Sequence, residues 1–540
     1  MTEKSNVKEI DKIENNNGDL NKKIIVNNKF VLVLFVALSL AFYVFAFINQ
    51  GLIDDGAFHI GRLKALAYDL SFSNIKPWIY TQTYYGVGYP LGIFYPDIFL
   101  VPFAILVKLG ISEYVSFMIM LVFINFFSGI SAYYCVKKIL KYEKYDDVEY
   151  KALVIALMYF VYPYRIWDVF FRMAIGESMS FIFIPLIILG VYEIFKQNKL
   201  GVSLFLGMTG IIYSHILSVV IVSSVLIVYY LLNVKKIIKN PKILVNTIIN
   251  ACFTVISTLM VTLPIWEMQS FTKLYYQTGK KTFGWLKDNV LFGVKGGDAT
   301  SIVITVILSV ALWKLSKKAG LKGKLGITLG YSIFICTGLF IWGPLERLFS
   351  FVNILQFPWR LLVIGAMPFA MLVGMATFDK KPIYIATIGM LWLATVFMCS
   401  TAYIPIDDVN LFGDYSVGRG EYLTADEEYF FLDKHTVDEI KFEYGILRKD
   451  NTYTFADSMN EDHSSYVLPL GYYKGYEIKD SKNNKYDYKI SENGFIEIEK
   501  KDDNIITVKY VGTMIQKVSM LISILSFVSI MIVITIRKKD

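Results

Sequence analysis

Long apolar runs constrain this chain more than any other feature. Runs of roughly 17–25 mostly apolar residues recur from Phe30 to the C-terminus, which is the length that an α-helix needs to cross the hydrocarbon of a bilayer. Backbone groups in hydrocarbon must find hydrogen bonds within their own segment, so such runs fold as helices. The chain has 540 residues, of which 55% are hydrophobic, more than in ordinary soluble proteins. The sequence therefore predicts a mainly α-helical, polytopic protein of the lipid bilayer.

About twelve spans are predicted from these runs. The first covers 30–49 and is interpreted as a retained span, because no small-residue cleavage signal follows it. Segment 94–109 contains two prolines and an aspartate, and we expect it to lie along the surface or to re-enter without crossing. The other spans are expected near 113–135, 151–163, 177–195, 202–214, 216–233, 243–264, 300–314, 325–342, 359–378, 383–402 and 513–536.

Composition divides the chain into further regions. Residues 1–29 are polar and rich in Asn and Lys, which predicts a disordered cytoplasmic tail. Residues 30–402 would form the membrane domain, and its first outer loop, 50–112, would contain amphipathic or re-entrant helices. Residues 403–512 are charged and end in alternating, strand-like segments, which predicts a small β-rich extracytoplasmic domain. Residues 513–540 would form the final span and a cytoplasmic tail.

The basic residues predict the orientation. Lysines concentrate in the short loops between apolar runs, and such loops face the cytoplasm in most membrane proteins. With 94–109 not crossing, every later basic cluster falls inside and both termini are cytoplasmic. The net charge of +8 is therefore interpreted as a topology signal, and no nucleic-acid partner is expected.

Two adjacent acids, Asp54 and Asp55, follow the first predicted span in the sequence QGLIDDGAFHIGRLKAL. Carboxylates at a membrane boundary are costly unless they have a use. Asp55, His59 and Arg62 have the spacing i, i+4, i+7, so a helix here would place an acid, a base and a permanent cation on one face. The alternative is that one aspartate only caps the N-terminus of an interfacial helix.

Three later segments bring polar residues to the same predicted face. They are YPYRIWDVFFRMAIGES, the SHILS turn and QFPWR, with Arg165, Asp168, Arg172, Glu177, His215 and Arg360. Acids and guanidinium groups on one rim suit an anionic lipid head group, because arginine grips phosphate bidentately. Alternatives remain open, since the arginines could snorkel to the interface, the histidine could serve only its turn, and the glutamate could stabilise a helix N-terminus.

Motifs of other chemistries are absent from the sequence. It contains no phosphate-binding loop, no dinucleotide-binding turn, no nucleophile elbow and no HExxH. The four cysteines lie in apolar segments without CxxC spacing, which disfavours disulfides and zinc. An ATP-driven machine or a soluble-type hydrolase is therefore not indicated.

Several motifs together resemble one family of bacterial membrane proteins. In chain order they are DDGAFHIGRL, GVGYPLGIFYPDIFLVPFAIL, YPYRIWDVFFRMAIGESMSFIFIPLIIL, YSHILS, QFPWRLL, GEYL and LPLGYYKGY. The pattern is similar to the 6-pyruvoyl-tetrahydropterin-synthase-related and YfhO-like polytopic proteins, although nothing in it resembles a pterin enzyme. That family in turn resembles the GT-C superfamily of integral-membrane glycosyltransferases. The resemblance implies a GT-C-like fold and a bacterial plasma-membrane location.

The resemblance also implies a substrate class and roles for residues. GT-C enzymes use polyprenyl-phosphate or -diphosphate sugar donors and place a catalytic acid directly after the first span. Carried over, Asp55 or Asp54 would be catalytic, and the substrate-binding set would be His59, Arg62, Arg165, Arg172, Glu177, His215 and Arg360. Metal-dependent GT-C enzymes usually show a further outer acidic motif, and the second outer loop has none. This leaves a requirement for Mg²⁺ or Mn²⁺ open.

The expected reaction is the transfer of a sugar from a polyprenyl-phosphate donor to a cell-envelope polymer or glycolipid on the outer face. An aspartate would act as general base in an inverting displacement. Two other functions are kept as alternatives. A translocase or exporter of a lipid-linked envelope precursor would need polar residues through the depth of the bilayer. A non-catalytic envelope assembly protein would use 403–512 as a binding module.

Overall fold

The computed structural model describes most residues of 26–274, 320–377 and 446–537, some residues of 306–318, and the pair 404–405. The predicted tail, the span 383–402 and most of the span 300–314 lie outside the described residues. So do Asp54 and residues 406–445, which form part of the predicted β-rich domain.

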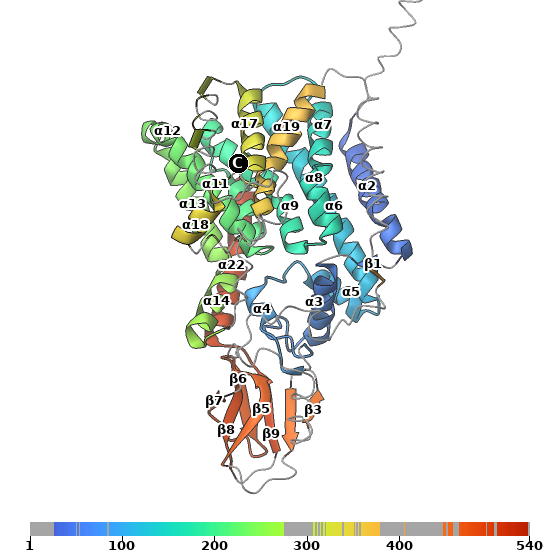
Figure 1. Cartoon of the computed structure of the whole chain (residues 1–540), viewed down its shortest axis with the longest axis vertical. Helices are drawn as coiled ribbons and strands as arrows, with labels where there is room; N and C mark the ends of the chain where they lie inside the picture. Colours follow the sequence, from blue (N-terminus) through green and yellow to red (C-terminus); the bar gives the residue numbers. More distant parts are fainter. Residues whose placement is uncertain are drawn as a thin grey trace, which may run out of the picture.

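The described helices form a bundle, with the sheets at one end of the elongated molecule (Figure 1). Its elements are α2 (Asn28–Asn49), α6 (Glu113–Tyr142), α7 (Val148–Phe160), α8 (Pro163–Ile166), η2 (Trp167–Phe171), α9 (Ile175–Gln197), α10 (Val202–Ile212), α11 (Ile216–Leu232), α12 (Val234–Lys239), α13 (Lys242–Ser257), α14 (Leu259–Phe271), α17 (Leu321–Phe334), α18 (Trp342–Leu348), η4 (Pro358–Gly365), α19 (Ala366–Thr377) and α22 (Met514–Arg537). Helix α6 packs on α2, α7 and α9, and α9 packs on α10. The prediction of a mainly helical chain is confirmed.

The number of clear membrane spans is smaller than predicted. Among the described residues, four helices are long and apolar enough to cross a bilayer, and six if each of two bent pairs counts as one span. Segments 202–214 and 216–233, predicted as spans, contain the shorter helices α10 and α11. Helix α10 has 11 residues and rises about 16 Å, roughly half of the hydrocarbon thickness. The expected count of about twelve is therefore not reached in this part of the chain.

The first outer loop folds between the bundle and the sheets, as Figure 1 shows for α3 (Gly56–Asp69), α4 (Leu91–Phe94) and α5 (Val101–Lys108). Helix α5 has 8 residues and rises about 12 Å, too little to cross hydrocarbon. This agrees with the prediction that 94–109 does not cross. A buried ion pair closes the loop, with Lys76 Nζ 2.6 Å from Asp97 Oδ1.

Two small antiparallel sheets follow near the C-terminus. The first has the strand order β3-β4-β9-β6, with β3 (Ile446–Lys449), β4 (Thr452–Ala456), β6 (Tyr476–Asp480) and β9 (Ile505–Tyr510). The second has the order β5-β8-β7, with β5 (Ser465–Gly471), β7 (Lys489–Ile490) and β8 (Phe495–Glu499). A further pair joins β1 (Gly51–Leu52) to β2 (Ile404–Pro405). Of the alternating segments near the end of the predicted domain, 494–500 and 504–511 form β8 and β9, whereas 484–490 is a strand only at Lys489–Ile490.

Helices α13 and α14 form one of the bent pairs, with an angle of 64° at Thr258. A break in a helix frees backbone groups, and in a membrane other protein groups must satisfy them. Tyr213 Oη donates to the Ser257 carbonyl at 2.6 Å. The backbone N–H of Met260 donates to Ser523 Oγ of α22 at 2.9 Å. Residues at the C-terminal end of α10 and in α22 therefore make hydrogen bonds with the backbone groups at the bend.

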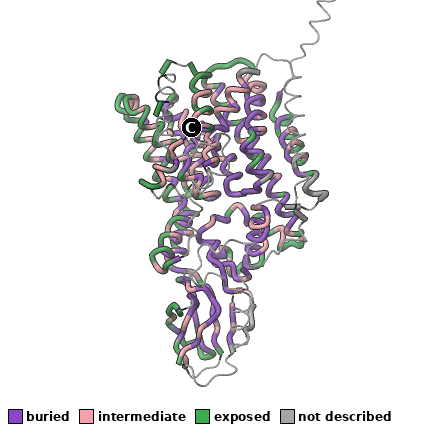
Figure 2. The backbone as a smooth tube through the Cα atoms, viewed as in Figure 1, coloured by how far each residue is buried: buried purple, intermediate pink, exposed green. Residues whose placement is uncertain are grey.

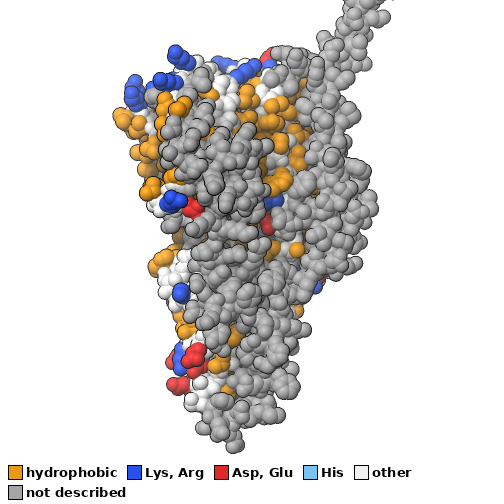
Figure 3. Space-filling model, viewed as in Figure 1, with side chains coloured by type: hydrophobic (Ala, Val, Ile, Leu, Met, Phe, Trp, Pro, Cys, Tyr) orange, Lys and Arg blue, Asp and Glu red, His pale blue; other side chains and the backbone are white. Residues whose placement is uncertain are grey.

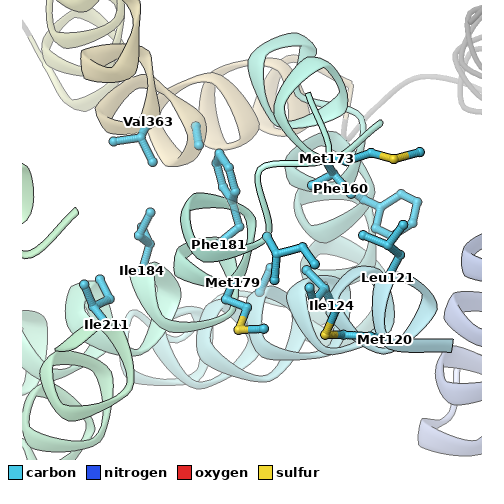
Figure 4. Packing of buried hydrophobic residues seen from close by; sticks show 14 of the residues in the cluster. Met120, Leu121, Ile124, Phe160, Met173, Met179, Phe181, Ile184, Ile211 and Val363 are labelled. Atoms are coloured by element: carbon cyan, nitrogen blue, oxygen red, sulfur yellow. The ribbon is translucent and has the colours of Figure 1, made fainter. Parts of the chain in front are cut away.

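Buried residues concentrate along α6, α7 and α9, whereas α11, α13 and α22 expose much of their surface (Figure 2). Figure 4 shows side chains of the core between α6, α7 and α9, including Leu121, Phe160, Met173 and Phe181. In the window of α22 that is apolar enough to span, only 11% of residues are buried. Helix α22 therefore offers a surface suited to lipid.

Candidate functional site

A short irregular segment places the second outer-loop motif. Residues Trp167–Phe171 form a π-helix, a rare conformation that occurs often at functional sites. Met173 then adopts a left-handed backbone with φ of 49°, which is uncommon for a residue other than glycine. Its side chain is anchored in the hydrophobic core (Figure 4). This turn brings Arg172 and the start of α9 together.

Asp55 lies at the N-cap position of α3, yet its side chain makes no capping hydrogen bond. Its Oδ2 instead accepts from Arg172 Nη2 at 3.3 Å. The two backbones are also joined, because Asp55 N donates to the Arg172 carbonyl at 2.9 Å. The cap-only interpretation of Asp55 therefore does not describe its side chain, which faces an arginine 117 residues away in sequence.

Arg172 connects three carboxylates. Its Nη1 donates to Asp168 Oδ1 at 2.9 Å and to Glu177 Oε2 at 3.2 Å, while Nη2 reaches Asp55. The side chains of Asp168, Glu177 and Arg172 are 0%, 2% and 6% exposed, whereas that of Asp55 is 41% exposed. Buried charges persist only when they are paired. Asp55 is thus the solvent-facing member of an otherwise buried group.

Glu177, at the start of α9, joins this group to the FPWR segment. Its Oε2 lies 3.3 Å from Arg360 Nε, and Tyr164 Oη donates to its Oε1 at 2.5 Å. Ser178 Oγ donates to Asp168 Oδ2 at 3.1 Å. We refer to Asp55, Asp168, Arg172, Glu177 and Arg360 as the Arg172 cluster. It contains three acids and two guanidinium groups from three separate segments.

Arg62 and His59 lie beside this cluster on α3. The Arg62 guanidinium lies over the Tyr95 ring at 3.9 Å, and its Nη2 donates to the Pro96 carbonyl at 3.2 Å. Its Nη1 is 3.3 Å from His59 Nδ1. Because arginine is only a donor, His59 Nδ1 accepts, and the proton of the neutral ring is then on Nε2.

His215 lies in the turn before α11, with Nδ1 2.8 Å from Ser218 Oγ. Its ring centroid is 6.3 Å from that of Tyr95. The turn packs closely on α9 at Gly176, where an added Cβ would come within 2.4 Å of Tyr95 Oη and 3.2 Å of His215 Cδ2. The first loop, the SHILS turn and α9 therefore meet around one glycine.

Both histidines are neutral in this setting. Burial lowers the pKa of His59 well below 6.5, and Arg62, His215 and Arg172 lower it further. Burial and Arg360 lower the pKa of His215 to about 3, while Glu177 opposes them. Neither ring carries a charge near pH 7, so the positive charge beside the cluster comes from arginines.

The structure brings together most predicted site residues, but it places Arg165 differently. Arg165 is fully buried, and it donates to the Phe160 carbonyl at 2.8 Å and to Asn125 Oδ1. In the described part of the chain, no hydrogen bond joins it to the acids of the cluster. We interpret Arg165 as a residue that holds α6 against the end of α7. Asp54, the other predicted catalytic acid, lies outside the described residues.

Three contributors were not predicted as site residues. From the sequence, Asp168 is only one polar residue of its motif, and Tyr95 and Tyr164 carry no predicted role. Asp168 and Arg172 have the i, i+4 spacing of a helical ion pair, which could have indicated the contact. Tyr95 gave no such signal, because its place over Arg62 depends on the path of the loop from α3 to α4.

The cluster does not present a ready set of metal ligands. In the ranges that the structure describes, no group of three or more His, Cys, Asp or Glu side chains is placed to hold a metal ion. Asp168 and Glu177 are hydrogen-bonded to Arg172, which occupies oxygens that a cation would need. A requirement for Mg²⁺ or Mn²⁺ stays open, as the sequence left it.

No family model matches this chain, and no curated protein matches it. The arrangement offers one half-exposed carboxylate, held by a buried arginine and flanked by neutral histidines and further guanidinium groups. Such a group can accept a proton from a bound hydroxyl, and the neighbouring arginines suit an anionic leaving group.

Proposed function

We propose that this protein is an integral-membrane glycosyltransferase of GT-C type. It would move a sugar from a polyprenyl-phosphate donor to a cell-envelope polymer or glycolipid. The single observation that carries the proposal is Asp55, whose carboxylate is 41% exposed while the Arg172 side chain that holds it is 6% exposed. An exposed acid fixed by a buried partner is what a positioned general base requires.

The distribution of basic residues supports an outer location for this site. Lys and Arg side chains gather at the end of the bundle opposite the sheets (Figure 3). The last turns of α6, α9 and α12 carry Lys141, Lys196 and Lys236. Because basic ends face the cytoplasm, we place α3, Asp55 and the sheets on the outer side of the plasma membrane.

The proposed reaction is a single displacement. Asp55 accepts the proton of an acceptor hydroxyl, and the oxygen of that hydroxyl attacks the anomeric carbon of the donor sugar. The bond between that carbon and the phosphate oxygen breaks, and polyprenyl phosphate leaves with the electron pair. The anomeric centre is inverted. Arg360 and Arg172 would stabilise the negative charge that grows on the phosphate.

The other predicted residues receive positioning roles. Arg62 fixes Tyr95 and the turn at Pro96 beside the cluster. His59 and His215 remain neutral, so neither ring adds a positive charge beside the Asp55 carboxylate. Glu177 holds Arg360 and Arg172 near each other. Arg165 is left out of the phosphate-binding set because its guanidinium bonds within the bundle.

The experiment is a transfer assay with purified protein and a panel of polyprenyl-phosphate sugars, in which released polyprenyl phosphate is measured. Asp55→Asn removes the base and keeps the side-chain shape, so we expect release to fall about 10²–10⁴-fold. Glu113→Gln is the matched control, because Glu113 is a partly exposed carboxylate paired with Lys64 at the same end of the bundle. That variant should retain full activity.

Two results would contradict the proposal. Release that continues at the wild-type rate in a well-folded Asp55→Asn protein would exclude Asp55 as the base. Movement of intact lipid-linked sugar across the membrane of proteoliposomes, without release of polyprenyl phosphate, would instead favour a translocase.

A further inference from the structure

An aromatic cavity lies where the end of α14 meets the first sheet. Its volume is about 470 Å³, within the range of small-molecule sites. Phe271, Tyr472 and Tyr488 line it together with Glu477 and Lys485. Phe271 comes from α14 and the other four lie within residues 472–488, so the cavity depends on the packing of α14 against this part of the sheets.

The aromatic side chains form a fixed platform. The Tyr472 ring stacks on Phe271 with centroids 5.0 Å apart and an interplanar angle of 23°. Tyr488 stands nearly perpendicular to Tyr472 at 5.8 Å. Its hydroxyl accepts from Gly475 N at 3.2 Å and donates to the Tyr473 carbonyl at 3.1 Å. Two hydrogen bonds therefore hold this ring in place.

The polar part of the cavity carries charges of both signs. Glu477 is an ion-pair partner of Lys479 at 2.6 Å and of Lys485 at 2.9 Å. A carboxylate accepts hydrogen bonds and an ammonium group donates them. The charged residues that line the cavity are Glu477, Asp487 and Lys485, so it combines aromatic faces with hydrogen-bond acceptors and a donor.

We propose that this cavity binds a saccharide through the faces of its pyranose rings. The C–H groups on one face of a pyranose carry slight positive charge and pack on the negative face of an aromatic ring, while its hydroxyls meet acceptors and donors such as Glu477 and Lys485. The role of this saccharide as glycosyl acceptor rests on the proposed function.

Structural ties join the cavity to the membrane part of the protein. Lys474 pairs with Glu267 of α14 at 3.0 Å, and Thr513 Oγ1 donates to the other oxygen of Glu267 at 2.5 Å. Helix α14 also packs on α4 of the first loop. A bound glycan would therefore be held by a part of the sheets that is fixed to the helices around the first loop.

The test measures binding of chitotetraose and of maltotetraose to the full-length protein in detergent, by saturation-transfer NMR and tyrosine fluorescence. Wild type should bind at least one of them. Tyr472→Ala should weaken that binding about tenfold, whereas Tyr472→Phe keeps the ring and should bind as wild type does. Tyr145→Ala is the matched control, because Tyr145 is a partly exposed tyrosine in the turn between α6 and α7.

The outcomes separate this inference from the proposed function. Asp55→Asn should lose transfer and keep saccharide affinity. Saccharide binding that depends on Tyr472, in a protein whose transfer does not depend on Asp55, would keep the cavity and reject the reaction. No binding of either probe to wild type, or equal binding by wild type and a folded Tyr472→Ala protein, would overturn the saccharide site.

Discussion

The first outer loop contributes to two buried groups of charge that differ in how completely they are closed. Lys76 and Asp97 lie 21 residues apart, and each is satisfied locally, by the Gly92 carbonyl at 2.8 Å and by Tyr80 Oη at 2.9 Å. Their side chains are 12% and 1% exposed. The Arg172 cluster instead joins distant segments and leaves Asp55 open to solvent.

This difference separates a structural ion pair from a candidate reactive group. In the Lys76–Asp97 pair, the contacts hold together the two ends of one loop. In the Arg172 cluster, two acids are buried against arginines while the third faces outward. A pair of the first kind should matter for stability, and a cluster of the second kind should matter for activity as well. The following predictions test that division, from the largest expected effect to the smallest.

Removing Asp97 should produce the largest loss of stability. Asp97→Ala leaves Lys76 buried without its counter-ion, and we expect a destabilisation of about 3–5 kcal/mol. The double variant Lys76→Met with Asp97→Leu should recover most of the lost stability, because well-packed apolar residues can replace a buried ion pair at little cost. Thermal unfolding in detergent measures both variants. Turnover per folded molecule should stay at the wild-type level, and a selective loss of turnover would break the comparison.

Arg172→Lys should affect activity more than stability. A single ammonium group cannot reproduce the two nitrogens that reach Asp55, Asp168 and Glu177. The position of Asp55 then relaxes, and we expect turnover to fall about 10²-fold. Release of polyprenyl phosphate, normalised to folded protein, is the measurement. A variant that lost stability but turned over normally would show that the cluster is structural, like the Lys76–Asp97 pair.

Gly176→Ala should disturb the packing beside the cluster. The new Cβ would meet Tyr95 Oη at 2.4 Å and the Ser214 carbonyl at 3.0 Å, so we expect a cost of about 1–3 kcal/mol. Gly330→Ala in α17 is the control, because nothing lies within 4 Å of its added Cβ, and it should be neutral or slightly stabilising. Thermal unfolding compares the two. Equal behaviour would mean that the contact of Gly176 is easily relieved.

Lowering the pH should decrease the free energy of unfolding, because of the two histidines beside the Arg172 cluster. The pKa values of His59 and His215 are lower in the folded protein than in the unfolded chain, at about 3 for His215 against 6.5. The contribution of these neutral histidines to the free energy of unfolding is complete above about pH 6.5. It is lost as the pH falls below 6.5, because the unfolded chain then binds protons that the folded protein does not. Each histidine adds a slope of up to about 1.4 kcal/mol per pH unit.

The pH dependence has a direct measurement and a control. Unfolding free energies measured from pH 7 down to pH 5 should decrease, and His59→Gln should reduce the slope while retaining an acceptor for Arg62. The double variant Lys76→Met with Asp97→Leu should keep the wild-type slope over this range. An unchanged slope in His59→Gln would show that His59 does not stay neutral in the folded protein.

The sequence predicted the helical character, the strands within 494–500 and 504–511, and a segment 94–109 without a helix long enough to cross. Each of these follows from local period and length, which a single sequence contains. It also predicted that Asp55, Arg172, Glu177 and Arg360 lie on one face. Within the residues that the structure describes, it overestimated the number of spans, because apolar runs such as 202–214 are hydrophobic enough to cross but fold into helices that are too short.

The sequence could not predict the partners within the site. Arg165 and Arg172 stand seven residues apart in one motif and look equivalent, yet a π-helix and the left-handed Met173 send their side chains to different surroundings. The stacking of Arg62 on Tyr95 depends on the loop that returns from α3 to α4. Contacts of this kind are set by tertiary packing, and no local period reveals them.

The bend between α13 and α14 has a consequence for synthesis of the protein. The N–H that the bend frees at Met260 is satisfied by Ser523, a residue 263 positions later. A chain leaves the ribosome from its N-terminus, so both halves of the bent pair enter the bilayer long before α22 does. Until α22 arrives, this donor must find a temporary partner or the pair must remain straighter. The bend between α13 and α14 is therefore one of the last features to form during membrane insertion. The packing of the sheets on α14 forms equally late.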